Sequence, residues 1–343
     1  MFRNSMKKIL LSATTFVAVI SLVLTGCGDD NNSDSASSAD KPSIVVTTNI
    51  LGDVVTNMVG DSFNVEVIMP PGSDPHDFQA SAQQVQKMME ADLLIVNGAN
   101  FEEGMLDVIE NAESDGVMIF EAISVVSQLE GSDDHGDHGG HDDHDDHEGH
   151  DDHDEEGHDD HEGHDHGGID PHFFTDPARM AVVAEGLSEF LVANFPDIDG
   201  FTSTANDYVQ QLRDLDADVE EILSVIGNNE RALVTNHAVF AYFADRYSFT
   251  VLGEIIPSSS TLASASAQQL SSLAEEIREN NVKAIFADAS SSDALAQTLA
   301  AEVEGVEVIN LYTESLGDPG SSGESYIDMV RFNAQAIASA LVE

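Results

Sequence analysis

Short apolar runs alternate with helix-like segments along most of this chain, and this alternation limits the possible folds more than any other feature. In the first half, the apolar runs predict strands at 43–48, 63–69, 93–97 and 116–120. Segments with a helical spacing of apolar residues separate these strands, at 49–60, 81–91 and 102–110. Strands that alternate with helices form a parallel sheet with helices on both faces. The first half therefore predicts an α/β lobe.

The second half repeats the pattern. Strands are predicted at 231–235, from 250 onward, at 284–287 and at 306–311. Helices are predicted at 239–246, 267–280, 292–302 and 326–341. The chain is therefore expected to fold as two α/β lobes, each a parallel sheet with flanking helices.

Two helical segments, 178–193 and 205–226, lie between these sets of strands. Apolar residues recur along the second at spacings of three and four, namely Tyr208, Leu212, Leu215, Val219, Ile222 and Ile226. Such a helix would be about 33 Å long at 1.5 Å per residue, enough to connect the lobes as a strut. The alternative is that it packs on one lobe only. We expect an N-terminal lobe at 43–199, a linking helix at 200–228 and a C-terminal lobe at 229–343.

A low-complexity run interrupts the first lobe. Residues 133–166 are 34 positions that contain only Asp or Glu (17), His (11) and Gly (6). None of these side chains can contribute to an apolar core, so the run predicts a disordered loop. Its imidazoles would form weak, exchangeable metal sites that end six residues before His172, and the alternative is a solubilising acidic linker. The histidines are His135, His138, His141, His144, His147, His150, His153, His158, His161, His164 and His166.

The charge balance excludes some classes of partner. The chain has 12 Lys and Arg against 64 Asp and Glu, a formal net charge of −52. Nucleic acids and anionic membrane surfaces are bound by basic faces, so neither is an expected partner. The single Cys also excludes an intramolecular disulfide and a Cys-rich zinc module.

The N-terminus has the pattern of an export signal. Three basic residues precede an apolar stretch at 9–24, which is short for a membrane span and typical of a signal peptide. The sequence Leu-Thr-Gly-Cys that ends at Cys27 resembles a bacterial lipobox. We therefore expect residues 1–26 to be removed, Cys27 to be lipidated, and residues 27–42 to form a flexible tether. The protein would be a membrane-anchored lipoprotein, in a periplasm or on the outer face of the cytoplasmic membrane. The alternative is a soluble exported protein.

Three histidines lie outside the low-complexity run: His76, His172 and His237. His76 and His237 follow predicted strands, and ligands of open α/β sheets bind at the carboxyl ends of strands. His76 and His172 each end an Asp-Pro-His tripeptide, so Asp74 and Asp170 could accept a hydrogen bond from the ring nitrogen that faces away from a metal. Because the three come from both lobes, the pattern indicates a metal site in a cleft. The alternative is that each is a simple loop residue.

Five segments together carry a family resemblance: PGSDPHDF, GIDPHFFTDP, TNHAVFAYFADRY, NVKAIFADASSS and LYTESLGDPGSSGESYIDMVRFN. In this order, over residues 43–341, the chain resembles the zinc- and manganese-type solute-binding lipoproteins of ABC importers. The resemblance implies two Rossmann-like lobes joined by a long rigid helix, with the metal in the cleft between them. Zinc-handling members often carry an acidic, His-rich loop at the position of 133–166.

The resemblance also implies a ligand set. His76 and His172 match the first-lobe ligands, and His237 matches a position that is commonly Glu in manganese members and His in zinc members. Glu314 matches the carboxylate ligand, which some zinc members lack, and Asp288 is the reserve candidate. The chain departs from the family at Ser258–Ser266, where many members have Glu-Pro-Ser.

Three histidines and one carboxylate would close a four-coordinate shell, whereas catalytic zinc keeps one position open. The chain also lacks the HExxH, G-x-S-x-G and P-loop patterns. We therefore expect a monomeric, non-enzymatic receptor that captures Zn²⁺, with Mn²⁺ as second choice, and delivers it to an ABC permease and its ATPase. The alternatives are a surface adhesin or metal-buffering lipoprotein without a transporter, and a metallohydrolase that uses the three histidines and a water.

Overall fold

The computed structural model describes residues 41–131 and 168–342. The predicted signal peptide, the lipidation at Cys27, nearly all of the tether and the His-rich run lie outside the described residues. No helix within the described ranges is both long and apolar enough to cross a membrane.

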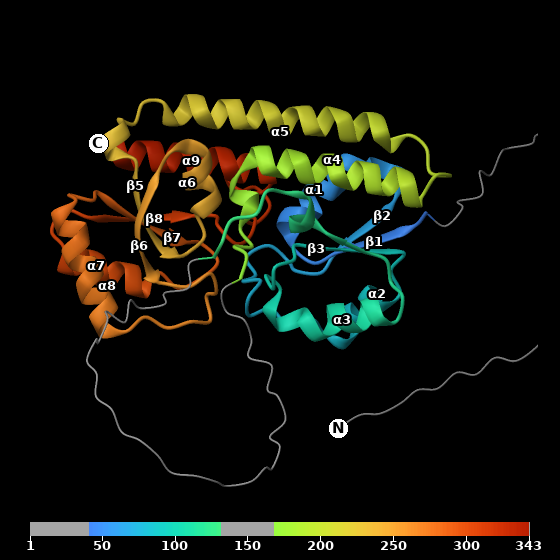
Figure 1. Ribbon diagram of the computed structural model, residues 1–343, viewed down its shortest axis with the longest axis horizontal. Helices are drawn as coiled ribbons and strands as arrows, with labels where there is room; N and C mark the ends of the chain where they lie inside the picture. Colours follow the sequence, from blue (N-terminus) through green and yellow to red (C-terminus); the bar gives the residue numbers. More distant parts are fainter. Residues whose placement is uncertain (1–40, 132–167, 343) are drawn as a thin grey trace, which may run out of the picture. The chain divides into compact units, whose positions relative to one another are not determined.

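The first lobe contains a four-stranded parallel sheet in the order β2-β1-β3-β4 (Figure 1). Its strands are β1 (Ser43–Val46), β2 (Asn64–Val67), β3 (Leu93–Val96) and β4 (Ile119–Glu121). Helix α1 (Asn49–Val59) covers one face, and α2 (Ala82–Met89) and α3 (Leu106–Ser114) cover the other. Alternate residues of β1 face opposite sides, because Val46 joins the cluster under α1 whereas Val45 joins the cluster with Met88 of α2.

The second lobe repeats this plan, with a parallel sheet in the order β6-β5-β7-β8. Its strands are β5 (Ala232–His237), β6 (Thr250–Ile256), β7 (Ala284–Asp288) and β8 (Glu307–Leu311). Helices α7 (Ala267–Glu279) and α8 (Ala294–Glu302) cover one face, and α6 (Ala241–Tyr247) and α9 (Tyr326–Val342) cover the other (Figure 1). The predicted class, two α/β lobes with parallel sheets, is confirmed.

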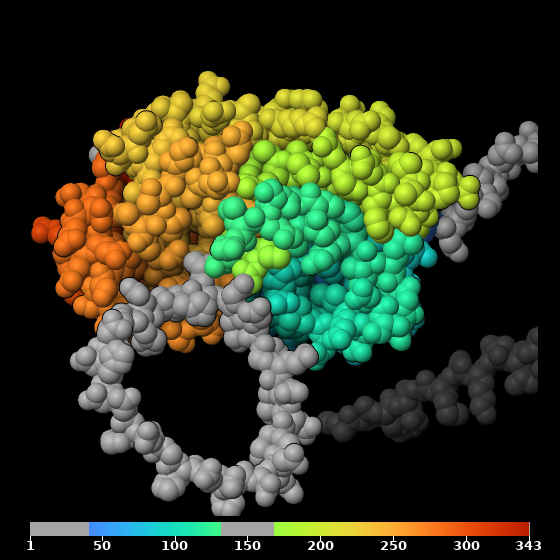
Figure 2. All heavy atoms as spheres, viewed as in Figure 1, coloured from blue at the N-terminus to red at the C-terminus, as the bar shows by residue number. Residues whose placement is uncertain are grey.

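Helices α4 (Pro177–Asn194) and α5 (Phe201–Leu223) lie between the two sheets in the sequence. Helix α5 packs against α1 and α4 of the first lobe and against α9 of the second, so it runs along both lobes (Figure 1). Figure 2 shows the atoms of α4 and α5, in yellow-green and yellow, along the upper edge of the molecule. The predicted apolar stripe is buried at Tyr208, Leu212, Leu215 and Val219.

One apolar core is shared by the two lobes. A single buried cluster contains Val46 of the first sheet, Leu212 of α5 and Phe286 of the second sheet. Two smaller clusters lie on the opposite faces, one with α2 and α3 and one with α7 and α8. The lobes are therefore joined along the side of α5 and are packed separately on the other side.

Local hydrogen bonds explain where several helices begin. Thr48 caps α1, and Ser81 and Ser266 form capping boxes with Gln84 and Gln269 at the starts of α2 and α7. Short 3₁₀ helices lie at Gly60–Ser62, Glu103–Met105, Ala122–Val125, Phe173–Thr175 and Asn228–Glu230. The helix predicted at 102–110 instead begins as the 3₁₀ turn at Glu103 and continues as α3. The reason is that Glu102 turns inward, where its carboxylate accepts hydrogen bonds from Asn97 N (2.7 Å) and Thr47 Oγ1 (2.6 Å).

Candidate metal site

Four buried side chains, three imidazoles and one carboxylate, converge between the two sheets. One ligand atom from each of His76, His172, His237 and Glu314 lies within 4.8 Å of the others. His76 follows β2, His172 precedes the 3₁₀ helix Phe173–Thr175, His237 ends β5, and Glu314 follows β8. The structure thus brings together the three histidines that the sequence pattern singled out and the glutamate that the family resemblance implied. Both lobes contribute, and three of the four side chains lie at or just beyond the carboxyl ends of strands.

The carboxylate of Glu314 lies at the centre of the group. Its Oε1 is 2.9 Å from His237 Nε2 and 3.3 Å from His172 Nε2, and its Oε2 is 3.6 Å from His76 Nε2. The same ring nitrogen, Nε2, therefore faces inward from all three histidines.

Several of these inward atoms have no hydrogen bond. His76 Nε2, His172 Nε2 and Glu314 Oε2 are buried without a hydrogen-bond partner among the described residues. Buried polar atoms are nearly always paired, because leaving one unpaired costs about 1–3 kcal/mol. Unpaired nitrogen and oxygen atoms that face one another in this way are suited to a bound cation.

The charges in the group are strongly coupled. Burial lowers the pKa of His172, but the Glu314 and Asp170 carboxylates outweigh burial and raise that pKa to about 10. Burial raises the pKa of Glu314, but His172 and His237 outweigh it and bring that pKa below its ordinary value. Without a metal, a proton on His172 therefore supplies the positive charge that Glu314 requires.

Two different carboxylates orient the first-lobe histidines. Asp170 Oδ1 lies 2.7 Å from His172 Nδ1 and also accepts the backbone N–H of His172, so the prediction for Asp170 is confirmed. Asp74 contacts His76 only at its backbone N–H (2.9 Å), whereas Glu103 Oε1 lies 3.0 Å from His76 Nδ1. The prediction that Asp74 binds the ring was therefore wrong, because the 3₁₀ turn after β3 places Glu103 there instead.

A sharp turn after β3 positions Glu103. Gly98, Ala99 and Asn100 have positive φ angles of 89°, 51° and 60°, which reverse the chain within a few residues. The buried carboxylate of Glu102 fixes this turn, as described above, and Phe101 then lies edge-on to the His76 ring at a centroid distance of 5.1 Å. The sequence held one signal for Glu103, an acid just beyond a predicted strand at the same sheet edge as His76.

Asp288 lies outside the group of four. It is buried at the end of β7, and its two oxygens accept the backbone N–H and the hydroxyl of Ser290, both at 2.8 Å. Burial and the nearby Glu314 charge raise its pKa to about 6. Both oxygens are thus engaged by Ser290, whereas Glu314 keeps an unpaired oxygen.

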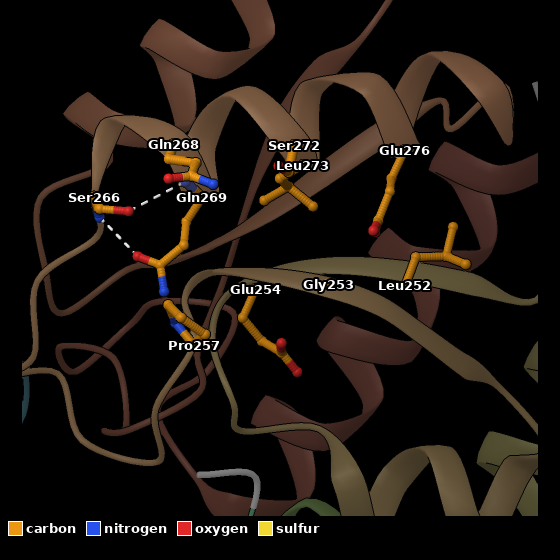
Figure 3. A pocket seen from close by; sticks show the side chains of 10 residues that line it. All are labelled: Leu252, Gly253, Glu254, Pro257, Ser266, Gln268, Gln269, Ser272, Leu273 and Glu276. Carbon is orange, nitrogen blue, oxygen red and sulfur yellow. Dashed lines mark hydrogen bonds between the residues drawn. The ribbon is translucent and has the colours of Figure 1, made fainter. Parts of the chain in front are cut away.

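A separate pocket of about 500 Å³ lies between β6 and α7 (Figure 3). Glu254, Gln269 and Glu276 are among the residues that line it, and none of the four clustered residues does. Burial raises the pKa of Glu254. The group of four is therefore distinct from this surface pocket.

Both the sequence and the fold of the chain are similar to those of known proteins. The family model described as zinc-uptake complex component A, periplasmic, matches residues 44–340. The chain is 26% identical over 345 residues to the manganese ABC transporter substrate-binding lipoprotein PsaA of Streptococcus anginosus, covering 98% of this chain and 99% of the relative. It is also 26% identical over 340 residues to the manganese-binding lipoprotein MntA of Halalkalibacterium halodurans, with coverage of 98% and 99%.

Among solved structures, the fold is similar to that of the periplasmic zinc-binding protein TroA of Treponema pallidum. The TM-score is 0.70 at 27% identity, and the match covers 88% of this chain and 100% of that chain. A cadmium-bound periplasmic metal-binding protein of Candidatus Liberibacter asiaticus has the same fold, with a TM-score of 0.70 at 20% identity and coverage of 88% and 100%.

Proposed function

The chain belongs to the family of periplasmic zinc-uptake complex component A proteins, and from this premise we propose that it captures Zn²⁺ for import. The metal would be held between the lobes by Nε2 of His76, His172 and His237 and by the carboxylate of Glu314. It would then be passed to the permease of an ABC importer, whose ATPase drives uptake. Metal-transporter receptors are substrate-binding components and not enzymes.

The observation that carries this proposal is the convergence of three imidazole Nε2 atoms on one buried carboxylate, with His76 Nε2, His172 Nε2 and Glu314 Oε2 unpaired among the described residues. Three imidazole nitrogens and one carboxylate match the N- and O-rich tetrahedral shells in which Zn²⁺ is commonly bound. Mn²⁺ prefers more oxygen ligands than this group offers. The donor set therefore supports zinc as the cargo.

The burial of the group favours capture over chemistry. His172 and His237 are 0% exposed, and His76 and Glu314 are 2% exposed. A catalytic zinc keeps one coordination position for water or substrate. Four protein ligands that fill a buried shell leave no such position.

Manganese is the second candidate cargo, and two observations favour it. Relatives such as PsaA and MntA are named for manganese. In addition, Glu314 Oε2 has no hydrogen bond, so both oxygens of this carboxylate could coordinate a larger ion.

Attachment to the membrane is part of the same proposal. The relatives named above are lipoproteins, and Cys27 follows a lipobox-like sequence. We infer that the lipid on Cys27 keeps a monomeric receptor next to its permease.

Competition between metals tests the proposed cargo. The untagged mature chain is titrated with Zn²⁺ and with Mn²⁺ against a chromophoric chelator, and the metal retained after purification is measured. We expect one tight Zn²⁺ site that His237→Ala abolishes. Replacing the exposed Gln210 by Ala, as a control, should leave the site intact. Displacement of Zn²⁺ by equimolar Mn²⁺ would make manganese the cargo, and the lack of any tight site would refute the proposal.

A further inference from the structure

Each Asp-Pro-His segment of the first lobe is bonded to a hydroxyl group of the second lobe. Thr261 Oγ1 donates to Asp74 Oδ2 at 2.7 Å, and Tyr242 OH donates to the backbone oxygen of Asp170 at 2.8 Å. Both hydroxyls therefore cross between the lobes beside a histidine of the metal site.

The Tyr242–Asp170 and Thr261–Asp74 hydrogen bonds differ in how their aspartates contact the histidines. Asp170 binds His172 directly, through its ring and its backbone, and Tyr242 is fully buried and also accepts the N–H of Leu129. Asp74 instead uses one oxygen for the backbone N–H of His76 and the other for Thr261. The carboxylate of Asp74 is thus shared between His76 and the second lobe.

Thr261 belongs to a segment that is anchored next to another ligand. The segment 257–266 runs from the end of β6 to the capping box of Ser266 and Gln269 at the start of α7 (Figure 3). Near its start, the oxygen of Ser258 accepts the N–H of Ala238 at 3.0 Å, and Ala238 directly follows His237. The segment 258–261 is therefore hydrogen-bonded at one end to Ala238, the residue after His237. At its other end it is hydrogen-bonded to Asp74, which in turn accepts the N–H of His76.

The segment 257–266 also lies near Glu103, the acid that contacts the His76 ring. Burial raises the pKa of Glu103, but its hydrogen bond with His76 and the proximity of Ser260 bring that pKa below its ordinary value. Thr261 thus binds the carboxylate that holds the backbone of His76, and Ser260 lies near the carboxylate that holds its ring. Leu262, the next residue, is 55% exposed, so the segment reaches solvent at this point.

We propose that Thr261 is a positioning residue for His76, which acts through Asp74 and sets the rate at which the bound metal leaves. When the lobes separate on this side, the Thr261–Asp74 bond breaks and His76 is the first ligand to lose its position. His172 stays in place, since its own carboxylate and the buried Tyr242 hold it. This inference rests on the proposed function, because it concerns release of the captured metal.

The test replaces the hydroxyl without changing the size of the side chain. Zn²⁺ at one equivalent is loaded on the mature chain, and its release to excess chelator is followed by rapid mixing. We expect Thr261→Val to release the metal about ten-fold faster, the range of one net hydrogen bond. Thr261→Ser, which keeps the hydroxyl, should restore the slow rate. Thr298→Val, on the exposed side of α8, is the matched control and should release at the wild-type rate.

Two further readouts separate positioning from a general loss of stability. The melting temperature of metal-free Thr261→Val should stay close to that of the wild type, and its Co²⁺-loaded form should show a changed ligand-field absorption spectrum. Asp74→Ala removes the acceptor of Thr261 together with that of the His76 N–H, so it should release metal at least as fast as Thr261→Val. Adding Thr261→Val to Asp74→Ala should change the rate little, because the bond is already lost.

Each outcome decides the proposal. A wild-type release rate in Thr261→Val, or failure of Thr261→Ser to rescue it, would overturn the role of Thr261 while leaving metal capture intact. If the wild type prefers Mn²⁺, the same rates are measured with Mn²⁺, and only the choice of cargo fails. If the wild type holds no metal tightly, both proposals fail.

Discussion

Proton release should accompany metal capture over an unusually wide pH range. His172 Nε2 is the atom that would bind the metal, and it lies 3.3 Å from Glu314 Oε1, so we expect it to carry a proton in the metal-free protein. Because Glu314 and Asp170 raise the pKa of this ring from 6.5 to about 10, the metal must displace that proton well above neutral pH.

The magnitude follows from the pKa of about 10. At about pH 7.5 roughly one ring in 300 is deprotonated, so the apparent affinity is roughly 300-fold below that of the deprotonated site. The apparent affinity should rise about ten-fold per pH unit up to about pH 10. In the metal-free protein the same proton stabilises the fold fully below about pH 6.5, and this contribution is lost as the pH rises through about 10.

The assay is titration calorimetry at about pH 8 in buffers of different ionisation enthalpy, which counts the protons released. We expect about one proton per tightly bound Zn²⁺. Asp170→Asn removes one of the carboxylates that raise the pKa, so it should release fewer protons. A tight site whose affinity levels off above about pH 7, with no proton released, would refute the reasoning.

Three further outcomes are expected. Glu103→Gln weakens the acceptor of His76 Nδ1 and should reduce zinc affinity about ten-fold in calorimetry, as is usual for partners of metal-binding histidines; unchanged affinity would show that Glu103 does not orient the ring. Tyr242→Phe leaves Asp170 O without its hydroxyl donor and should lower the free energy of unfolding by about 1–3 kcal/mol in urea, and no change would contradict the importance of this contact. Deletion of 133–166 should remove only the weak metal sites in a titration, so loss of the tight site would disprove the separation of roles.

The fold was predictable because its signals are local. Buried strands such as Leu93–Val96 and the apolar stripe of α5 are visible in a few consecutive residues. Helix α3 started later than predicted because Glu102 is drawn inward by Thr47, which is 55 residues away in the sequence. This hydrogen bond is a tertiary contact, so the residues around Glu102 show no sequence pattern that would predict it.

The site was predictable in part. The positions of His76 and His237 beyond strands indicated a ligand site, whereas Glu314 was chosen through the family resemblance. The two Asp-Pro-His tripeptides look alike in the sequence, yet Asp170 binds its ring and Asp74 does not. The difference comes from Glu103 and Thr261, which are 27 and 187 residues from the groups that they contact.

Through the shared apolar core, metal bound at the site should stabilise both lobes together. Since Val46, Leu212 and Phe286 belong to one cluster, the lobes are expected to unfold together as one cooperative unit. A ligand that binds only the folded state stabilises that entire unit, by about 2.7 kcal/mol at a hundred-fold excess over Kd. Amide hydrogens of α5, which contributes none of the four clustered side chains, should therefore exchange more slowly once metal is bound. Hydrogen exchange along the full length of α5 would therefore distinguish the metal-bound protein from the metal-free protein.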